Sequence, residues 1–246
     1  MPLRAIPPPS SRVYRVARRG ADSFAPPDWA WAGGPGGTFP GRFDDPGKRD
    51  GLPEDRCFRV IYCATERAGA FGETLANRRV PLDTLARVAA VRDGELGDDQ
   101  LQPGVIPAEW WQRRQMGNMI LDPALRFVDL AAVETIAHLR RVLAPVAISL
   151  GLADVDLSAV TGPHRLLTQR AARYVYEQGD AGGVPRYAGI RYLSRLSAAW
   201  ECWAVFDDRL AGMRDASEPI RPHDAALRTV AALFHLAIEA NDASSV

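Results

Sequence analysis

The order in which strand-like and helix-like segments follow one another constrains the fold of this chain more than any other feature. Alternating β-branched and aromatic residues predict strands at 11–16, 58–63, 85–92, 124–130, 189–192 and 200–206. Helical periodicity predicts helices at 66–77, 133–143, 167–178 and 222–238. Because strands do not alternate strictly with helices, an α+β domain is favoured over a doubly wound parallel sheet. We expect small mixed or antiparallel sheets flanked by helices.

Local signals place the ends of these helices. Thr65 is the expected N-cap of the helix at 66–77, and Pro145 stops the helix that begins near Val133. Gly179 stands where the helix at 167–178 is expected to close, and Pro222 where the last helix is expected to start. With 246 residues, of which 47% are hydrophobic, the chain is long enough for one domain with a substantial core.

Charge and composition argue against several classes of function. Thirty basic residues balance thirty acidic ones, so we expect no direct nucleic-acid partner. The apolar run at 142–153 is broken by Pro145 and is shorter than the ~20 residues of a spanning helix, and prolines occupy the place of a signal peptide's apolar core. We therefore expect no membrane association and a cytoplasmic location.

The cysteines and histidines show no metal-binding spacing. Cys57, Cys63 and Cys202 contain no CxxC pair, which predicts buried free thiols in a reducing compartment. The four histidines form no HExxH motif and no cluster with the cysteines, so we expect no metal. The tryptophans at 110, 111, 200 and 203 lack interleaved basic residues, which favours core or partner-interface roles over base stacking.

A long irregular segment at 21–51 is rich in Gly, Pro and Asp, and loops of this length within a domain are usually functional. Its glycine run at 33–37 lacks the GK[ST] ending of a phosphate-binding loop, so flexibility is the better interpretation.

Three short motifs, taken together and in order, resemble the RES domain family. They are Gly41-Arg42-Phe43 with Pro46-Gly47 behind it, Val60-Ile61-Tyr62 leading to Gly72-Glu73-Thr74-Leu75, and Gly189-Ile190-Arg191-Tyr192-Leu193-Ser194-Arg195. The Arg, Glu and Ser for which the family is named fall at Arg42, Glu73 and Ser194. The resemblance spans 13–207, with a helical insertion at about 80–160, an extended arm at 1–12 and a helical extension at 208–246.

The resemblance implies a fold similar to ADP-ribosyltransferases, degradation of NAD+, and a toxin role beside an antitoxin that carries a helix-turn-helix domain. NAD+ would be the substrate, with no separate cofactor, and phosphate is a candidate co-substrate. Transfer of ADP-ribose onto a protein and a non-catalytic antitoxin-binding module are the alternatives. Whether further copies of the chain assemble is left open.

The motif residues suit this chemistry. The nicotinamide of NAD+ is a cationic leaving group, so one carboxylate, Glu73, can stabilise the oxocarbenium-like ribose; the alternative is an exposed helix glutamate. Arg42 offers a planar fork for the diphosphate and Arg15 a second donor, unless both are solvated. Tyr62 can stack on the nicotinamide or donate its hydroxyl, or simply pack at the sheet edge. Ser194 can hold the ribose or amide, or be an ordinary turn residue.

Overall fold

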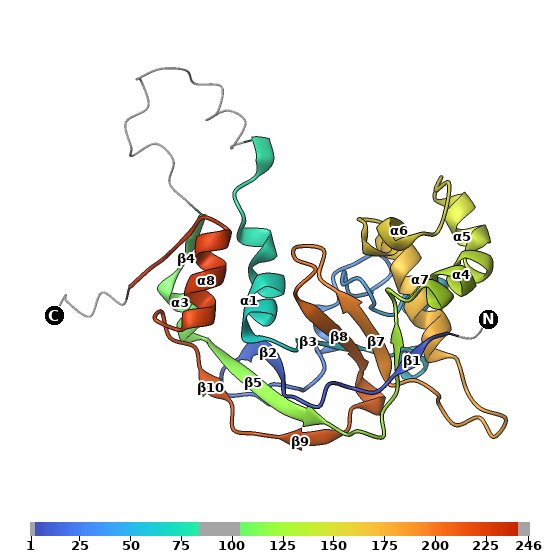
Figure 1. Cartoon of the computed structure of the whole chain (residues 1–246), viewed down its shortest axis with the longest axis horizontal. Helices are drawn as coiled ribbons and strands as arrows, with labels where there is room; N and C mark the ends of the chain where they lie inside the picture. The colour runs from blue at the N-terminus through green and yellow to red at the C-terminus, as the bar shows by residue number, and fades with distance from the viewer. Residues whose placement is uncertain (1–2, 84–103, 241–246) are drawn as a thin grey trace.

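The computed structural model describes residues 3–83 and 104–240, in which one large sheet carries helices above it (Figure 1). The strands are β1 (Ala5–Ile6), β2 (Val13–Arg18), β3 (Val60–Ala64), β4 (Gly104–Ile106), β5 (Arg114–Leu121), β6 (Phe127–Asp129), β7 (Gly189–Leu193), β8 (Glu201–Phe206), β9 (Gly212–Arg214), β10 (Glu218–Pro219) and β11 (Leu236–Ile238). The α-helices are α1 (Arg67–Leu75), α3 (Ala108–Gln112), α4 (Val133–Val142), α5 (Ala144–Ser149), α6 (Leu157–Thr161), α7 (Arg165–Tyr176) and α8 (Ala225–Leu233).

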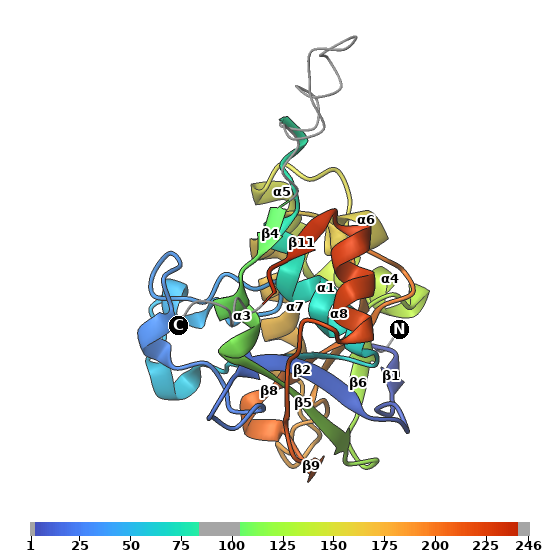
Figure 2. The same cartoon turned by 90° about the vertical axis from the view of Figure 1, so that its left-hand side faces the viewer.

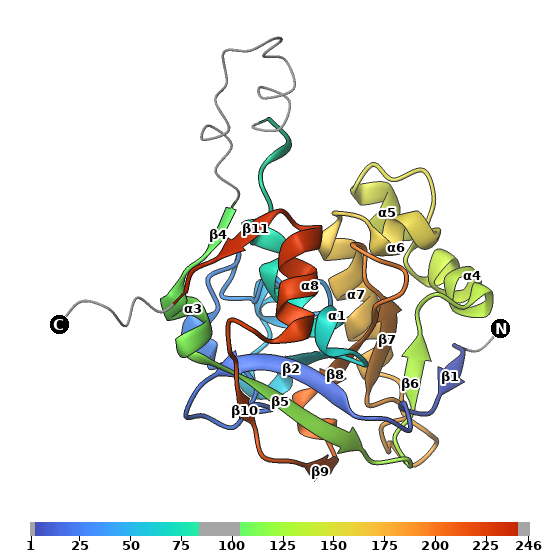
Figure 3. The ribbon, with the colours of Figure 1, turned by 60° about the vertical axis from the view of Figure 1, so that its left-hand side comes forward.

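The strands of the large sheet are mostly antiparallel. Their order is β1-β6-β7-β8-β3-β2-β5-β10, with β9 also paired to β5, and among the described strands of this sheet only β6 and β7 run parallel. Strands β2 and β5 run side by side over the length of β2 (Figure 3). A separate parallel pair joins β11 to β4. This arrangement confirms the α+β class that the element order predicts.

The two faces of the sheet bury two separate groups of side chains. Along β3, Val60 and Ala64 belong to the large core beneath the helices, whereas Ile61 and Cys63 point to the opposite face. The alternation follows from the two-residue period of a strand. Cys63 and Cys202 are buried free thiols as expected, and Cys57 is half-buried.

The helices form two groups over the sheet. Helix α1 packs beside α8, and β4 and β11 lie next to them, while α4 to α7 gather over the other end (Figures 1 and 2). Trp200 packs closely against α1 because Gly72 has no side chain: an added Cβ would lie 2.1 Å from Cζ3 of that indole. Within 3–83 and 104–240, no helix has the length and apolar character needed to cross a bilayer.

Gly189 allows β7 to approach β8, and its replacement is expected to be costly. A Cβ at this position would lie 2.1 Å from the carbonyl oxygen of Ala204, a backbone atom that cannot rotate away. We expect Gly189→Ala to lower the free energy of unfolding by about 3 kcal/mol, the upper end for overpacking, as measured by urea denaturation. Gly33→Ala is the matched control, because a Cβ added at Gly33 would meet no atom within 4 Å. Equal stability of the two variants would contradict the argument.

Three helix ends differ from the sequence prediction. The hydroxyl of Thr65 donates to Glu201 instead of capping α1, whose N-cap position is held by Glu66. Helix α8 starts after Asp224, whose carboxylate accepts the Ala226 and Leu227 N–H groups, and it ends before 236–238, which forms β11. Helix α7 ends at Tyr176, so Gly179 lies beyond its cap.

The expected helical insertion at about 80–160 is wrong for part of its length, because β5 and β6 of the large sheet lie within it. Strand β5 was not predicted from the sequence. It is paired on both sides and mostly buried, so its sequence lacks the alternation of polar and apolar residues. The extension at 208–246 likewise contributes β9, β10 and β11 besides α8. The strand expected at 85–92 lies outside the described residues.

Candidate active site

A cavity of about 310 Å³ opens between the two helix groups, within the size range of small-molecule pockets. It is formed by β2, β3, α1, the segment before β3, the first residue of α7, and β7 with the segment that follows it. The residues that line it are Tyr14, Arg15, Val16, Gly41, Arg42, Tyr62, Cys63, Ala64, Ala70, Glu73, Thr74, Ala76, Arg165, Tyr192, Arg195 and Leu196.

Glu73 projects from α1 into the cavity and is held there by Ser194. The Ser194 hydroxyl donates to Oε1 of Glu73 and accepts the Leu196 N–H at 3.1 Å. Ser194 itself is buried and is not one of the residues that line the cavity. Its hydroxyl is therefore engaged in orienting the carboxylate, a role that differs from the direct ligand contact expected from the sequence.

Arg42 is a buried cation with an unused donor. The residue is only 8% exposed, and its Nη1 atom is buried with no hydrogen-bond partner among residues 3–83 and 104–240. Burial lowers the pKa of Arg42, and the neighbouring Arg165 and Arg195 lower it further, while Tyr192 and Glu73 act in the opposite direction. Burying a guanidinium donor without a partner costs free energy. This favours a site in which an anionic ligand supplies the partner.

The backbone around Arg42 is fastened by Asp44 and Tyr62. One Asp44 oxygen accepts the Gly41 N–H at 2.6 Å, and the other accepts the Tyr62 hydroxyl at 3.0 Å. That hydroxyl in turn accepts the Phe43 N–H at 2.9 Å. Although Tyr62 lines the cavity, its hydroxyl is thus occupied by the segment that carries Arg42.

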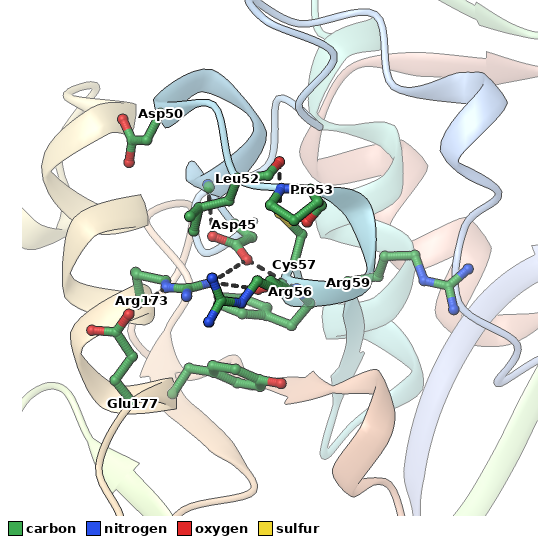
Figure 4. Close-up of polar contacts among 12 residues, drawn as sticks. Asp45, Asp50, Leu52, Pro53, Arg56, Cys57, Arg59, Arg173 and Glu177 are labelled. Atoms are coloured by element: carbon green, nitrogen blue, oxygen red, sulfur yellow. Dashed lines mark hydrogen bonds and ion pairs between the residues drawn. The ribbon is translucent and has the colours of Figure 1, made fainter.

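Helix α7 anchors the same segment from the other side (Figure 4). Arg173 reaches Asp45 at 2.9 Å, and Asp45 also accepts the N–H groups of Gly47 and Phe58. Closer to the cavity, the buried Gln169 amide donates to the carbonyl oxygen of Gly41 at 3.0 Å. These contacts hold the segment from Gly41 to Phe58 in place, and Gly41 and Arg42 at its start line the cavity.

Arg15 also lines the cavity from β2. One of its nitrogens donates to the carbonyl oxygen of Ala25 at 3.1 Å, and burial lowers its pKa. Arg15 therefore adds positive charge to the part of the cavity wall that β2 forms.

Comparison with known proteins identifies the family. The family model described as RES domain matches residues 12–227. The chain belongs to the RES domain family. No curated protein matches it. Among solved structures, a chain in the crystal structure of the M. tuberculosis MbcT-MbcA toxin-antitoxin complex is 15% identical with a TM-score of 0.48, and the match covers 93% of this chain and 92% of that one.

The three residues that the sequence resemblance assigned as the family's Arg, Glu and Ser converge at this site. Arg42 and Glu73 line the same cavity, and Ser194 contacts Glu73 directly. Arg15 and Tyr62, the other residues singled out from the sequence, line it as well.

Sequence reasoning missed several residues of this RES domain site. Arg165 and Arg195 line the cavity, and Tyr192 places its ring 5.8 Å from the Arg42 guanidinium. Asp44 and Gln169 hold the backbone that carries Arg42. The signals were weak: Arg195 follows Ser194 in the third motif, but Arg165 is one arginine among many.

The charges that face the cavity are strongly unequal. Arginines at 15, 42, 165 and 195 line it, and among the described lining residues Glu73 is the only carboxylate. Such a site suits a ligand with two or more negative charges and one centre that becomes positive during reaction.

The burial of Asp44 makes stability depend on pH. Burial raises the pKa of Asp44 to about 6, against the lowering effect of its hydrogen bonds to Gly41 and Tyr62. Because the folded state binds this proton more tightly than the unfolded state, the stabilisation is present at low pH and is lost as pH rises from about 4 to beyond 6. We expect the unfolding free energy of wild type relative to Asp44→Asn to fall by about 2–3 kcal/mol over that window in urea denaturation. Parallel pH curves for the two proteins would contradict this.

Proposed function

We propose that this RES domain cleaves the bond between nicotinamide and ribose in NAD+. The observation that carries the proposal is the shared cavity of Arg42 and Glu73, in which a buried guanidinium nitrogen has no partner in the described part of the chain and a serine orients the carboxylate. The charge pattern matches the substrate, since the diphosphate of NAD+ is anionic and the ribose next to nicotinamide becomes cationic as the bond breaks.

Each residue has a defined part in the proposed reaction. Arg42, with Arg165 or Arg195 beside it, binds the diphosphate. Glu73 stabilises the oxocarbenium-like ribose, directly or through a ribose hydroxyl, and Ser194 fixes the carboxylate in place. Nicotinamide leaves with the electron pair of the broken bond and becomes neutral, so no general acid is required. Water or phosphate then attacks the ribose and gives ADP-ribose or its 1-phosphate.

Direct product analysis tests the proposal. Purified protein is incubated with NAD+, with and without phosphate. Nicotinamide and the ADP-ribose products are then separated by chromatography and identified by mass spectrometry. Nicotinamide release supports the proposal, and the mass of the second product identifies the acceptor. The absence of nicotinamide under both conditions would overturn it, and an ADP-ribose mass shift on a protein would favour the transferase alternative.

We also propose that the enzyme acts as a cytoplasmic toxin that a cognate antitoxin neutralises, as the family resemblance implies. Depletion of NAD+ would arrest growth without any further target. Induced expression without neighbouring genes is expected to stop growth as cellular NAD+ falls. Growth arrest with an unchanged NAD+ level would separate toxicity from the proposed activity.

A further inference from the structure

We propose that Asp44 is a positioning residue that keeps Arg42 directed at the cavity without neutralising it. The ligand identity rests on the proposed function, whereas the positioning role rests on the contacts around Arg42. Gly41 and Phe43, the two neighbours of Arg42, are both held by the Asp44–Tyr62 pair through their N–H groups.

The contact between Asp44 and Gly41 is close enough to fix the backbone. A Cβ on Gly41 would lie 2.4 Å from Oδ2 of Asp44 and 2.6 Å from the Tyr62 hydroxyl oxygen. On the other side, Gln169 of α7 donates to the Gly41 carbonyl oxygen. The residue that precedes Arg42 is therefore clamped at both its N–H and its carbonyl group.

We call the hydrogen bonds that join Asp44, Tyr62 and Gln169 to the backbone of Gly41 and Phe43 the clamp. Both oxygens of Asp44 take part in it. Oδ2 accepts from Gly41 and Oδ1 from Tyr62, while Nη1 of Arg42 has no hydrogen-bond partner among the residues that the structure describes. A carboxylate that paired with the Arg42 guanidinium would occupy the donors that are needed to bind another anion. Here the carboxylate stabilises the backbone and leaves the Arg42 donor for a ligand.

A carboxylate suits this contact because both of its oxygens act as acceptors, one for the Gly41 N–H and one for the Tyr62 hydroxyl. Asparagine at this position has the same shape but one acceptor oxygen, so its NH₂ group would face either the Gly41 N–H or the Tyr62 hydroxyl. A protonated Asp44 has the same deficiency. The ionisable and charged groups that face Asp44 are Tyr62 from β3, Arg165 from α7 and Asp45 from its own segment.

The test compares Asp44→Asn with Asp55→Asn, which makes the same charge change at an exposed position of the same segment. ADP-ribose is the probe in isothermal titration calorimetry between pH 5 and 8, because its diphosphate stays doubly charged there. We expect Asp44→Asn to weaken binding about tenfold and Asp55→Asn to leave it unchanged. Wild-type affinity is expected to fall below about pH 6, where Asp44 becomes protonated, and Asp44→Asn is expected to lack this step.

If Asp44→Asn does not fold, Tyr62→Phe is a second variant that tests the same contacts. It removes the hydroxyl that links Phe43 to Asp44, and the double variant is expected to lose less affinity than the sum of the single losses. In the NAD+ assay, Asp44→Asn should raise KM and leave kcat within about twofold, because the diphosphate is held in the ground state as well.

The outcomes separate this inference from the proposed function. If wild type binds ADP-ribose and Asp44→Asn weakens it, positioning stands even if nicotinamide is never released. A folded Asp44→Asn protein with wild-type affinity at every pH would overturn the positioning role, and so would a wild-type protein that binds no ADP-ribose.

Discussion

Replacement of Glu73 by glutamine is expected to reduce nicotinamide release from NAD+ by about 10²–10³-fold, comparable to the loss of one preorganised transition-state contact. Glutamine keeps the shape of the side chain, and its amide oxygen can still accept a hydrogen bond from the Ser194 hydroxyl. It lacks the negative charge that stabilises the ribose as the bond breaks. The measurement is the initial rate of nicotinamide release at saturating NAD+.

Glu66→Gln is the matched control, because Glu66 is an exposed glutamate at the start of the same helix and its side chain caps no N–H. Its activity should equal that of wild type. In cells, Glu73→Gln should relieve the growth arrest that expression of the wild type causes. A folded Glu73→Gln protein that still releases nicotinamide at the wild-type rate would remove Glu73 from the mechanism.

The sequence predicted the elements that carry the site more successfully than those that complete the sheet. Strand β3 and helix α1 follow from a β-branched run and a helical period, and they bring Tyr62 and Glu73 to the cavity. Strand β5 was missed because side chains on both of its faces are buried, Met116 in one core group and Met119 in the other, so its sequence lacks polar alternation. Burial by other elements is not encoded in local periodicity.

The same limit applies within the site. Three motifs identified Arg42, Glu73 and Ser194 because they could be matched to a family pattern, but the contact between Ser194 and Glu73 spans 121 positions of sequence. Asp44 belongs to no motif that predicts chemistry, and its importance becomes visible only when both its oxygens are seen to hold the backbone beside Arg42. Partners that are distant in sequence require the folded structure.

Replacement of Arg42 by methionine is expected to have opposite effects on ligand binding and on stability. Loss of a charge-assisted contact to the diphosphate should weaken ADP-ribose binding by about 10–100-fold. The ligand-free variant should be at least as stable as wild type, because the buried Nη1 has no partner within the described ranges and methionine removes that desolvation cost. Calorimetric titration and urea denaturation of the same preparations measure the two effects.

Arg49→Met, an exposed arginine of the same segment, is the control and should change neither quantity. Arg42→Lys keeps the charge but not the planar fork, so its affinity should lie between those of wild type and Arg42→Met. If Arg42→Met instead unfolds more easily and binds ADP-ribose as wild type does, Arg42 is a structural residue. A gain in stability together with a loss of affinity is the result that only a ligand-binding arginine gives, because wild type then carries an unpaired buried charge that the ligand completes.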